Sequence, residues 1–214
     1  MNGPWGYDLR PQEIEDRSFE IIDELADLSR FSSAETALVK RVIHATGDPS
    51  FVDLLAWSPD AIDAAAAALR SGAPIVTDVN MVRAGISQQR LARFGSSVHC
   101  SIADPEIAEE ARSRGLTRSI VAVEKAVREY PGAVFAFGNA PTALFRLLEL
   151  VDAGEARPAA VVGVVVGFVG AAESKEALMA RQTPPWISCR GNKGGSNVAA
   201  SIVNALLKVA AGEV

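Results

Sequence analysis

The sequence has only two cysteines, Cys100 and Cys189, and their spacing matches neither a metal site nor a disulfide framework. Both stand in strand-like contexts, so we expect buried free thiols and a reducing, cytoplasmic location. The sequence also has no basic block, and its formal net charge is −5 over 214 residues. This charge balance argues against a nucleic-acid partner, because nucleic-acid binders cluster lysine and arginine to meet the phosphates.

Long apolar runs are missing as well. The longest, "PAAVVGVVVGFVGAA" at 158–172, is short for a membrane span and is interrupted by glycine. The first twenty residues have no apolar core between a basic start and a small-residue cleavage site, so we expect no secretory leader. The sequence therefore predicts no membrane association, and the apolar run is better explained as a buried strand.

From Ala73 onward, short β-branched runs alternate with helical segments. Continuous apolar strands that alternate with helices are typical of parallel strands covered on both faces. We therefore predict one domain over residues 1–214, with a three-layer α/β/α fold and a mostly parallel sheet of about five strands. The five predicted strands lie in the segments 73–78, 96–102, 133–138, 159–167 and 185–191.

The part of the chain before Ala73 reads as helical. Apolar residues at helical spacing predict a helix over about 18–31. Ser32 and Glu35 have the spacing of a capping box, which predicts a second helix that ends at Gly47. A third helix is expected within 58–72, with a proline in its first turn and a glycine at its end.

Three strand-to-helix junctions share one design, namely "FAFGNAPTALF", "VVVGFVGAAESKEAL" and "SCRGNKGGSNVAAS". Such turns gather at the carboxyl ends of parallel strands, where open α/β sheets bind ligands. Glycine permits a close backbone approach, and a helix N-terminus presents unpaired N–H groups to an anion. The three turns together indicate a ligand with several negative groups. Tight turns also use glycine for geometry alone, and no familiar phosphate-binding motif is present.

Seven segments resemble the precorrin-8X methylmutase family, in the same order and across essentially the whole chain: "RSF" (17–19), "DLSRF" (27–31), "RVIHATG" (41–47), "TRS" (117–119), "GNAPTALF" (138–145), "GFVGAAESKEAL" (167–178) and "RGNKGGSNVAA" (190–200). The resemblance implies a homodimeric α/β isomerase of vitamin B12 biosynthesis, with no organic cofactor and no bound metal of its own. Its expected reaction moves a methyl group from ring carbon 11 to ring carbon 12 of precorrin-8 or cobalt-precorrin-8, giving hydrogenobyrinic or cobyrinic acid.

The resemblance also implies roles for individual residues. His44 matches the family's catalytic histidine, which transfers a proton, although a histidine near a helix end also suits the helix dipole. Arg41 and Ser18 match substrate-contacting positions, whereas a solvated arginine and a helix N-cap are their structural alternatives. His99 matches no family motif and is expected in a strand.

Further ligand candidates come from their places at the junctions, with turn geometry as the rival explanation. Asp78 and Met81 follow a strand end, where a helix-start role for Asp78 is the alternative. Arg118 is a candidate cation for the ring carboxylates. The remaining candidates lie in or beside the three turns: Asn139, Thr142, Gly167, Gly170, Ser174, Lys175 and Lys193.

Two other functions stay open on the residues alone. One is a tetrapyrrole carrier without turnover, which would not need His44. The other is a nucleotide- or phosphosugar-dependent enzyme, which would need the phosphate motifs that are missing. The segments "RGNKGGSNVAASIVNALL" and "MVRAGI" are closer to the branch that inserts cobalt early, so we favour a cobalt-loaded substrate over a metal-free one.

Overall fold

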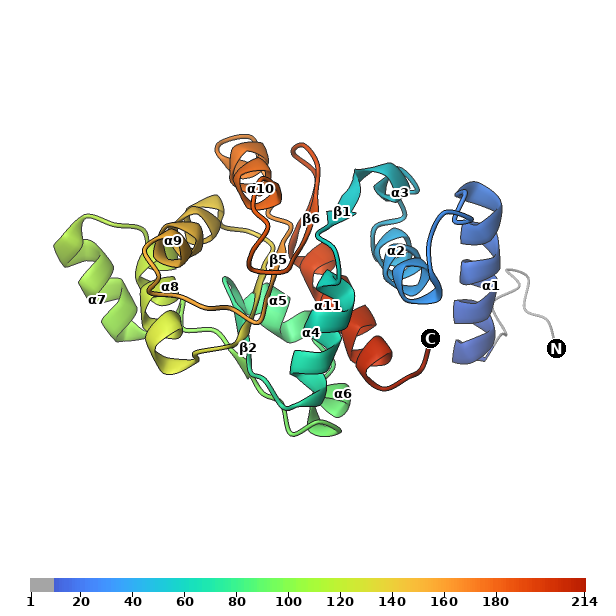
Figure 1. Ribbon diagram of the computed structural model, residues 1–214, viewed down its shortest axis with the longest axis horizontal. Helices are drawn as coiled ribbons and strands as arrows, with labels where there is room; N and C mark the ends of the chain where they lie inside the picture. The colour runs from blue at the N-terminus through green and yellow to red at the C-terminus, as the bar shows by residue number, and fades with distance from the viewer. Residues whose placement is uncertain (1–9) are drawn as a thin grey trace, which may run out of the picture.

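A computed structural model describes residues 10–214, and within that range one six-stranded sheet has the strand order β1-β6-β5-β4-β2-β3. Strands β2 to β6 pair in parallel, whereas β1 runs antiparallel to β6 with Leu55 opposite Cys189. The sheet passes through the middle of the molecule (Figure 1). Its strands are β1 (Leu55–Trp57), β2 (Ile75–Thr77), β3 (Val98–His99), β4 (Val134–Phe137), β5 (Ala160–Gly163) and β6 (Trp186–Cys189).

Helices cover both faces of this sheet, which confirms the predicted three layers. Side chains alternate along a buried strand, so Ile75 and Val162 face one core while Val76 and Val161 face the other. The first core includes α2 (Ser33–Thr46), α4 (Ala61–Arg70), α5 (Asn80–Gly85), α6 (Gln88–Ala92) and α11 (Ser196–Ala210). The second includes α8 (Arg118–Glu129), α9 (Pro141–Asp152) and α10 (Ala171–Met179), and α7 (Pro105–Arg114) packs on α8.

All five predicted strands are present, and the sequence missed β1. This strand has three residues and directly follows the one-turn helix α3 (Phe51–Leu54), so neither element is long enough to show a period. The apolar run at 159–167 also forms a shorter strand than predicted, because β5 ends at Gly163. Beyond Gly163, the N–H groups of Val164 and Val166 still donate to the Phe137 and Gly138 carbonyls at 2.9 and 3.2 Å, and the chain then forms the turn that precedes α10.

The first helix, α1, spans Pro11–Leu25, so the predicted bounds of 18–31 were wrong. Its start is set by Arg10, whose backbone N–H donates to Glu13 Oε2 at 2.9 Å. The backbone becomes extended at Ala26, where φ is −134°. Ser18 is therefore not an N-cap but a mid-helix residue, and its hydroxyl donates to the Ile14 carbonyl at 2.7 Å.

The next two helices follow the predicted start and stop signals more closely. Ser32 and Glu35 form the predicted capping box of α2, and Gly47 ends the helix with a φ of 65°. Helix α4 begins at Ala61, so Pro59 precedes it and does not lie in its first turn. The chain thus begins α4 from Asp60, which takes a left-handed conformation.

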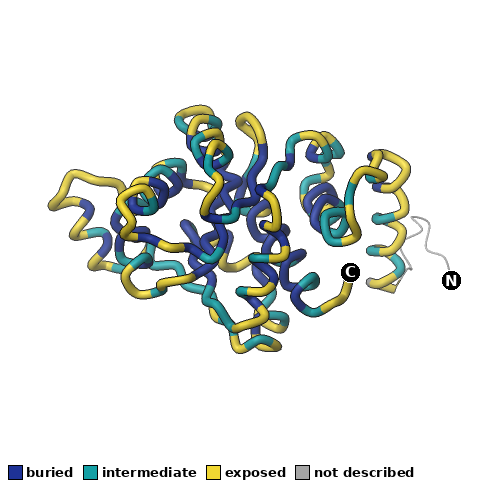
Figure 2. Tube along the Cα trace, viewed as in Figure 1, coloured by how far each residue is buried: buried dark blue, intermediate teal, exposed yellow. Residues whose placement is uncertain are grey.

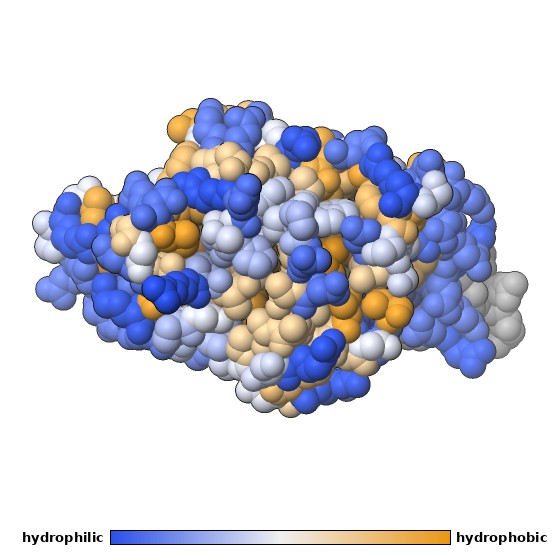
Figure 3. Space-filling view, viewed as in Figure 1, coloured by the Kyte–Doolittle hydropathy of each residue, from blue (hydrophilic) through white to orange (hydrophobic). Residues whose placement is uncertain are grey.

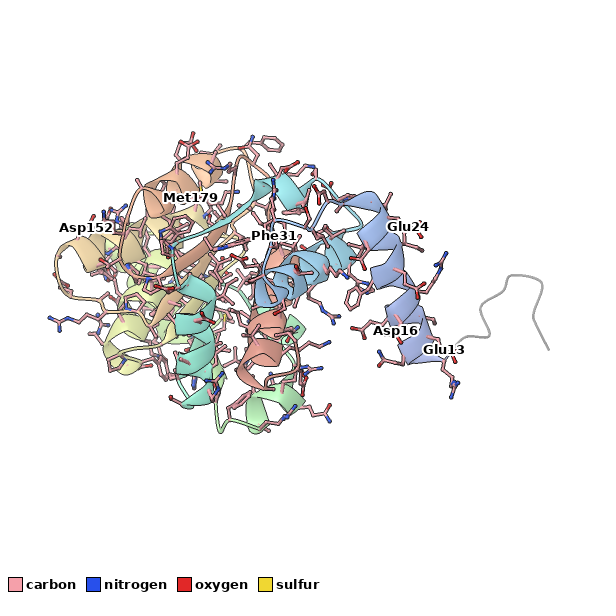
Figure 4. All side chains as sticks on the ribbon, turned by 45° about the vertical axis from the view of Figure 1, so that its right-hand side comes forward. Glu13, Asp16, Glu24, Phe31, Asp152 and Met179 are labelled. Atoms are coloured by element: carbon pink, nitrogen blue, oxygen red, sulfur yellow. The ribbon has the colours of Figure 1, made fainter. Side chains whose placement is uncertain are left out.

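Helix α1 lies at the edge of the molecule and packs on α2. Figure 4 shows this helix with Glu13, Asp16 and Glu24 labelled, at the opposite end of the view from Asp152. Much of α1 is exposed, whereas buried residues follow the strands and the inner faces of the central helices (Figure 2). Three of its exposed residues are apolar and share one helix face, namely Ile14, Ile21 and Leu25.

Within residues 10–214, no helix is long and apolar enough to cross a membrane. Residues 1–9 belong to the predicted domain and to the stretch in which the sequence predicts no leader. They lie outside the described residues.

Candidate active site

The three glycine-containing turns meet at the carboxyl edge of the parallel strands, as the sequence predicts. Gly138 directly follows β4, and a Cβ added there would lie 2.8 Å from the carbonyl oxygen of Gly195, which precedes α11. The N–H of Gly195 donates to the Val164 carbonyl at 2.9 Å, and the N–H of Gly167 donates to the Asn192 carbonyl at 3.2 Å. The turns 138–140, 164–170 and 190–195 therefore form one continuous surface.

The backbone of the first turn is held on its buried side by a carboxylate of the protein itself. Asp78 is buried, and its side chain accepts the backbone N–H groups of Gly138, Asn139 and Ala140 at 3.1, 2.7 and 2.7 Å. Burial raises the pKa of the Asp78 carboxyl, although the three N–H donors oppose that shift. These N–H groups are already satisfied, so the start of α9 offers the ligand the exposed Asn139 side chain rather than bare amides.

The second turn presents apolar side chains. Gly167 and Gly170 flank Phe168 and Val169, which are both 90% exposed. Ser174, one turn into α10, is buried and its hydroxyl donates to the Ala171 carbonyl at 3.1 Å. This segment therefore exposes the apolar side chains of Phe168 and Val169 to solvent, while the Ser174 hydroxyl points into the protein.

Two lysines meet at the third turn, Lys193 within it and Lys175 from α10, and their side chains point in opposite directions. Lys193 extends outward, and its ammonium lies 2.6 Å from Asp48 Oδ2 and 2.9 Å from the Ser50 hydroxyl. Lys175, on α10, is fully buried and donates to the Lys193 carbonyl at 2.6 Å. Burial lowers the pKa of the Lys175 ammonium. Of the two, only Lys193 can reach a ligand at the surface.

His44 is exposed near the end of α2 and lines the same depression as Ser18. This depression of about 270 Å³ lies between α1 and α2, and the Phe19 ring meets the imidazole edge-on at 5.6 Å between centroids. The lining residues are Ser18, Ile21, Ile22, Leu25, Ile43, His44, Gly47 and Pro49. The depression is apolar apart from its hydroxyl and imidazole, which suits a flat hydrophobic ligand with a proton to exchange.

Two contacts connect the end of α2 to the third turn. The Asn197 side chain, in the first turn of α11, donates to the Ala45 carbonyl at 3.3 Å. Asp48, which follows the helix end, holds Lys193 as described above. The sequence analysis missed both residues. The Asp-x-Ser spacing was the available signal for Asp48, because its side chain accepts the Ser50 N–H at 3.0 Å in a local turn.

Arg41 is engaged by a carboxylate that the sequence analysis did not find. Its guanidinium forms an ion pair with Glu15 of α1 and lies 5.0 Å from the centroid of the Phe19 ring. Lys208 of α11 also approaches Glu15, at 3.7 Å. Arg41 is thus on the same helix face as His44, but its charge is directed towards α1.

The remaining candidates lie at the β2–β4 side of the edge. Met81 is 72% exposed on α5, and Arg118 is exposed at the start of α8. The hydroxyls of Thr117 and Thr142 are 3.3 Å apart, which joins the starts of α8 and α9. The candidate residues therefore extend along the carboxyl edge of the sheet. Exposed polar groups lie at the β2–β4 side, and His44 lies beyond the β6 side.

His99 lies in β3, as predicted, and its carbonyl accepts the Thr77 hydroxyl at 3.3 Å. Its ring stacks on Tyr130 at 4.1 Å between centroids, and Nε2 lies 2.8 Å from the Ser97 hydroxyl. Burial, with the nearby charge of Arg83, lowers the pKa of the His99 imidazole. His99 is thus held by its neighbours, whereas His44 is open to a ligand.

These features define an α/β enzyme with a small-molecule site at the carboxyl edge of its sheet. The family model described as precorrin-8X methylmutase matches residues 13–209. The cobalt-precorrin-8 methylmutase of Salmonella typhimurium is 47% identical over 207 residues, which cover 94% of this chain and 96% of that protein. The precorrin-8X methylmutase of a Sinorhizobium species is 44% identical over 196 residues, covering 91% and 93%.

The crystal structure of the precorrin-8x methyl mutase from Thermus thermophilus superposes with a TM-score of 0.87 at 40% identity, covering 94% of this chain and 97% of that one. The chain belongs to the precorrin-8X methylmutase family, which confirms the resemblance seen in its motifs. It is accordingly an isomerase, a methylmutase of cobalamin biosynthesis.

The contact between Asp48 and Lys193 predicts an unusually acidic carboxyl. Hydrogen bonds from Lys193 and Ser50 lower the pKa of Asp48 from the usual 3.8 to about 2. The contribution of the ionised Asp48 to the stability of the fold is then complete above pH 3.8 and is lost as the pH falls through about 2. Carboxyl-carbon NMR titration measures this pKa directly.

Lys193→Ala is expected to raise the Asp48 pKa back towards its usual value. Lys125→Ala is the matched control, because that lysine pairs with Asp104 and Glu106 instead. An Asp48 that titrates at the ordinary value in the unmodified protein would contradict the ion pair.

Proposed function

We propose that this chain moves a methyl group from ring carbon 11 to ring carbon 12 of precorrin-8, with or without cobalt, and that His44 is the proton donor and acceptor. The observation that carries the proposal is the exposed His44 in an apolar depression with Ser18, next to the turn that carries Lys193. Family membership supplies the reaction class, and this geometry supplies the residue for the proton.

The surface suits both parts of such a ligand. A precorrin is a broad, partly conjugated ring with acetate and propionate carboxylates around its rim. Phe168 and Val169 offer exposed carbon for the face of the ring. Lys193 and Arg118 offer charge for the carboxylates, and Asn139 offers an amide. Charged hydrogen bonds of this kind are worth more than neutral ones, so a protein with a net charge of −5 can still hold a polyanion.

The reaction defines what His44 would do. The methyl group migrates within the π-system of the ligand, so no protein nucleophile is required. A proton placed on a ring nitrogen or carbon makes the migration terminus electron-poor and carries the rearrangement to the corrin. Histidine ordinarily titrates near neutrality, so it can give and recover a proton at physiological pH. The Phe19 ring meets the imidazole edge-on, and Ser18 lines the same depression as His44.

A homodimer completes the proposal. Ile14, Ile21 and Leu25 of α1 are 48%, 41% and 61% exposed, although all three are large and apolar. Ile21 follows Ile14 by seven positions and Leu25 follows Ile21 by four, so the three side chains form one stripe along the helix. Ile21 and Leu25 of this stripe line the His44 depression. The visible face of the molecule also exposes hydrophobic residues over its middle, with hydrophilic ones at both ends (Figure 3). A second copy on the α1 stripe would bury it and enclose the depression.

Replacing His44 by alanine tests the assigned proton donor. We expect His44→Ala to fold and to bind the corrin product, but to lose on the order of 10²–10⁴ in turnover, the usual contribution of a placed acid. Absorbance at the product's visible bands measures the conversion. His99→Ala is the control, and its rate should equal that of the unmodified protein.

Two results would contradict this assignment. Parent-rate turnover by His44→Ala would remove the residue from the mechanism. An unmodified protein that binds the corrin product yet never converts precorrin-8 would instead indicate a tetrapyrrole carrier.

The metal state of the substrate is a separate expectation. We expect cobalt-precorrin-8 to be turned over with the higher kcat/KM, in agreement with the sequence segments that favour the cobalt-early branch. Parallel assays with cobalt-loaded and metal-free precorrin-8, monitored by absorbance under anaerobic conditions, make the comparison. A higher kcat/KM for the metal-free ring would reverse this assignment and leave the reaction class unchanged.

The proposed dimer predicts a defined response to a charge placed on α1. The unmodified chain, of 22.5 kDa, should sediment as a dimer at micromolar concentration. Leu25→Glu should shift it towards the monomer, because a carboxylate in an apolar interface loses its hydration. Leu116→Glu, at an exposed position between α7 and α8, should leave the dimer intact. A monomeric unmodified protein would refute the proposal.

A further inference from the structure

Among residues 10–214, Lys175 is unusual for a charged residue because it is fully buried and has no carboxylate partner among its described contacts. Its ammonium donates to the Lys193 carbonyl at 2.6 Å and lies 3.7 Å from Cys189 Sγ. A buried ammonium is costly unless its donors are satisfied. The other four lysines all have a carboxylate at 3.7 Å or less: Lys40 with Asp23, Lys125 with Glu106, Lys193 with Asp48, and Lys208 with Glu15.

The carbonyl that Lys175 holds belongs to the turn between β6 and α11. That carbonyl points into the protein, where the Cys189 thiol also donates to it at 3.1 Å. An inward carbonyl requires a buried donor, and an ammonium is the strongest one that a side chain can supply. On the outer side of the same residue, the Lys193 ammonium reaches Asp48, four residues after His44. Lys175 thus determines which side of the turn faces the site.

We propose that Lys175 is a positioning residue of the methylmutase site, which acts by fixing the 190–195 turn so that Lys193 and the start of α11 face a ring carboxylate. Lys175 itself is buried beneath the turn and touches no ligand. This role rests on the proposed function, because it presumes that the turn binds a carboxylate of the corrin. It also gives Lys175 a different part from the direct ligand contact that the sequence suggested.

A double-mutant cycle tests the proposal, with hydrogenobyrinic acid as the probe and absorbance titration as the readout. Lys175→Met keeps the length and bulk of the side chain and removes the charge. We expect it to weaken product binding about 10-fold, as for a lost charged hydrogen bond. Lys193→Ala should weaken binding as well. The affinity of the double variant for the product should be no lower than that of whichever single variant binds it less tightly. Such non-additivity is expected where one residue acts through the other.

Kinetics separate positioning from general destabilisation. Lys175→Met should raise KM, while kcat and the pH profile of kcat stay within twofold of the unmodified protein, because His44 is untouched. Lys125→Met is the control, since it removes a lysine of the same length that pairs with surface carboxylates. If Lys175→Met does not fold, Lys175→Gln retains an N–H donor and should show a smaller rise in KM.

Three outcomes would overturn the role of Lys175. Fold-changes that multiply in the double variant would mean that Lys175 and Lys193 act independently. A lowered melting temperature with unchanged affinity would reduce Lys175 to a stabilising residue. A changed pH profile of kcat would place it in the proton transfer. If the unmodified protein binds neither hydrogenobyrinic nor cobyrinic acid, the proposed function itself is refuted. That result is distinct from the three outcomes above, which refute only the role of Lys175.

Discussion

The burial of α11 is the constraint on which the rest of the structure depends. This helix contacts α2, α4, α5 and α6, as well as strands β4 and β5, and ten of its fifteen residues are buried. Each fully buried aliphatic side chain contributes about 1.5–3 kcal/mol relative to exposure, so α11 has little freedom to shift. Its N-terminus is consequently fixed against the end of α2. The relation between His44 and the 190–195 turn follows from that packing, through Asn197 and the Ala45 carbonyl.

Buried charges of opposite sign support two of the three turns from within. Asp78 accepts three N–H groups of the first turn, and Lys175 donates to a carbonyl of the third. Hydrogen bonds on the buried side of a turn fix its backbone conformation. The exposed side chains of the turn are then not needed to hold that conformation. The outer surface then consists of side chains: Asn139 at the first turn, Phe168 and Val169 at the second, and Lys193 at the third. This combination of carbon, amide and cation matches a ring with acidic substituents better than a bare phosphate.

The cations near His44 are engaged with carboxylates of the protein. Arg41 pairs with Glu15, and Lys193 pairs with Asp48. A ligand carboxylate would have to replace or share these partners, which keeps the side chains ordered and avoids an unpaired charge in the site. Exchange of one carboxylate for another costs less reorganisation than ordering a solvated side chain, so a polyanion can bind to a surface that is already neutralised.

The sequence by itself determined the parallel strands, the helices α7 to α11, the capping of α2 and the meeting of the glycine turns, but not the short helices α5 and α6. These features depend on local period, on turn chemistry and on the rule that parallel strands share one carboxyl edge. It could not determine β1, which is too short to show a period, or the bounds of α1, where Arg10 and Ala26 override the apolar spacing. Only the tertiary structure decided which way the polar side chains point. Asp78 and Lys175 turn inward because a neighbouring turn offers each of them backbone partners, whereas Lys193 turns outward to Asp48. Those partners are 18 to 145 residues apart in the sequence, so no local pattern records them.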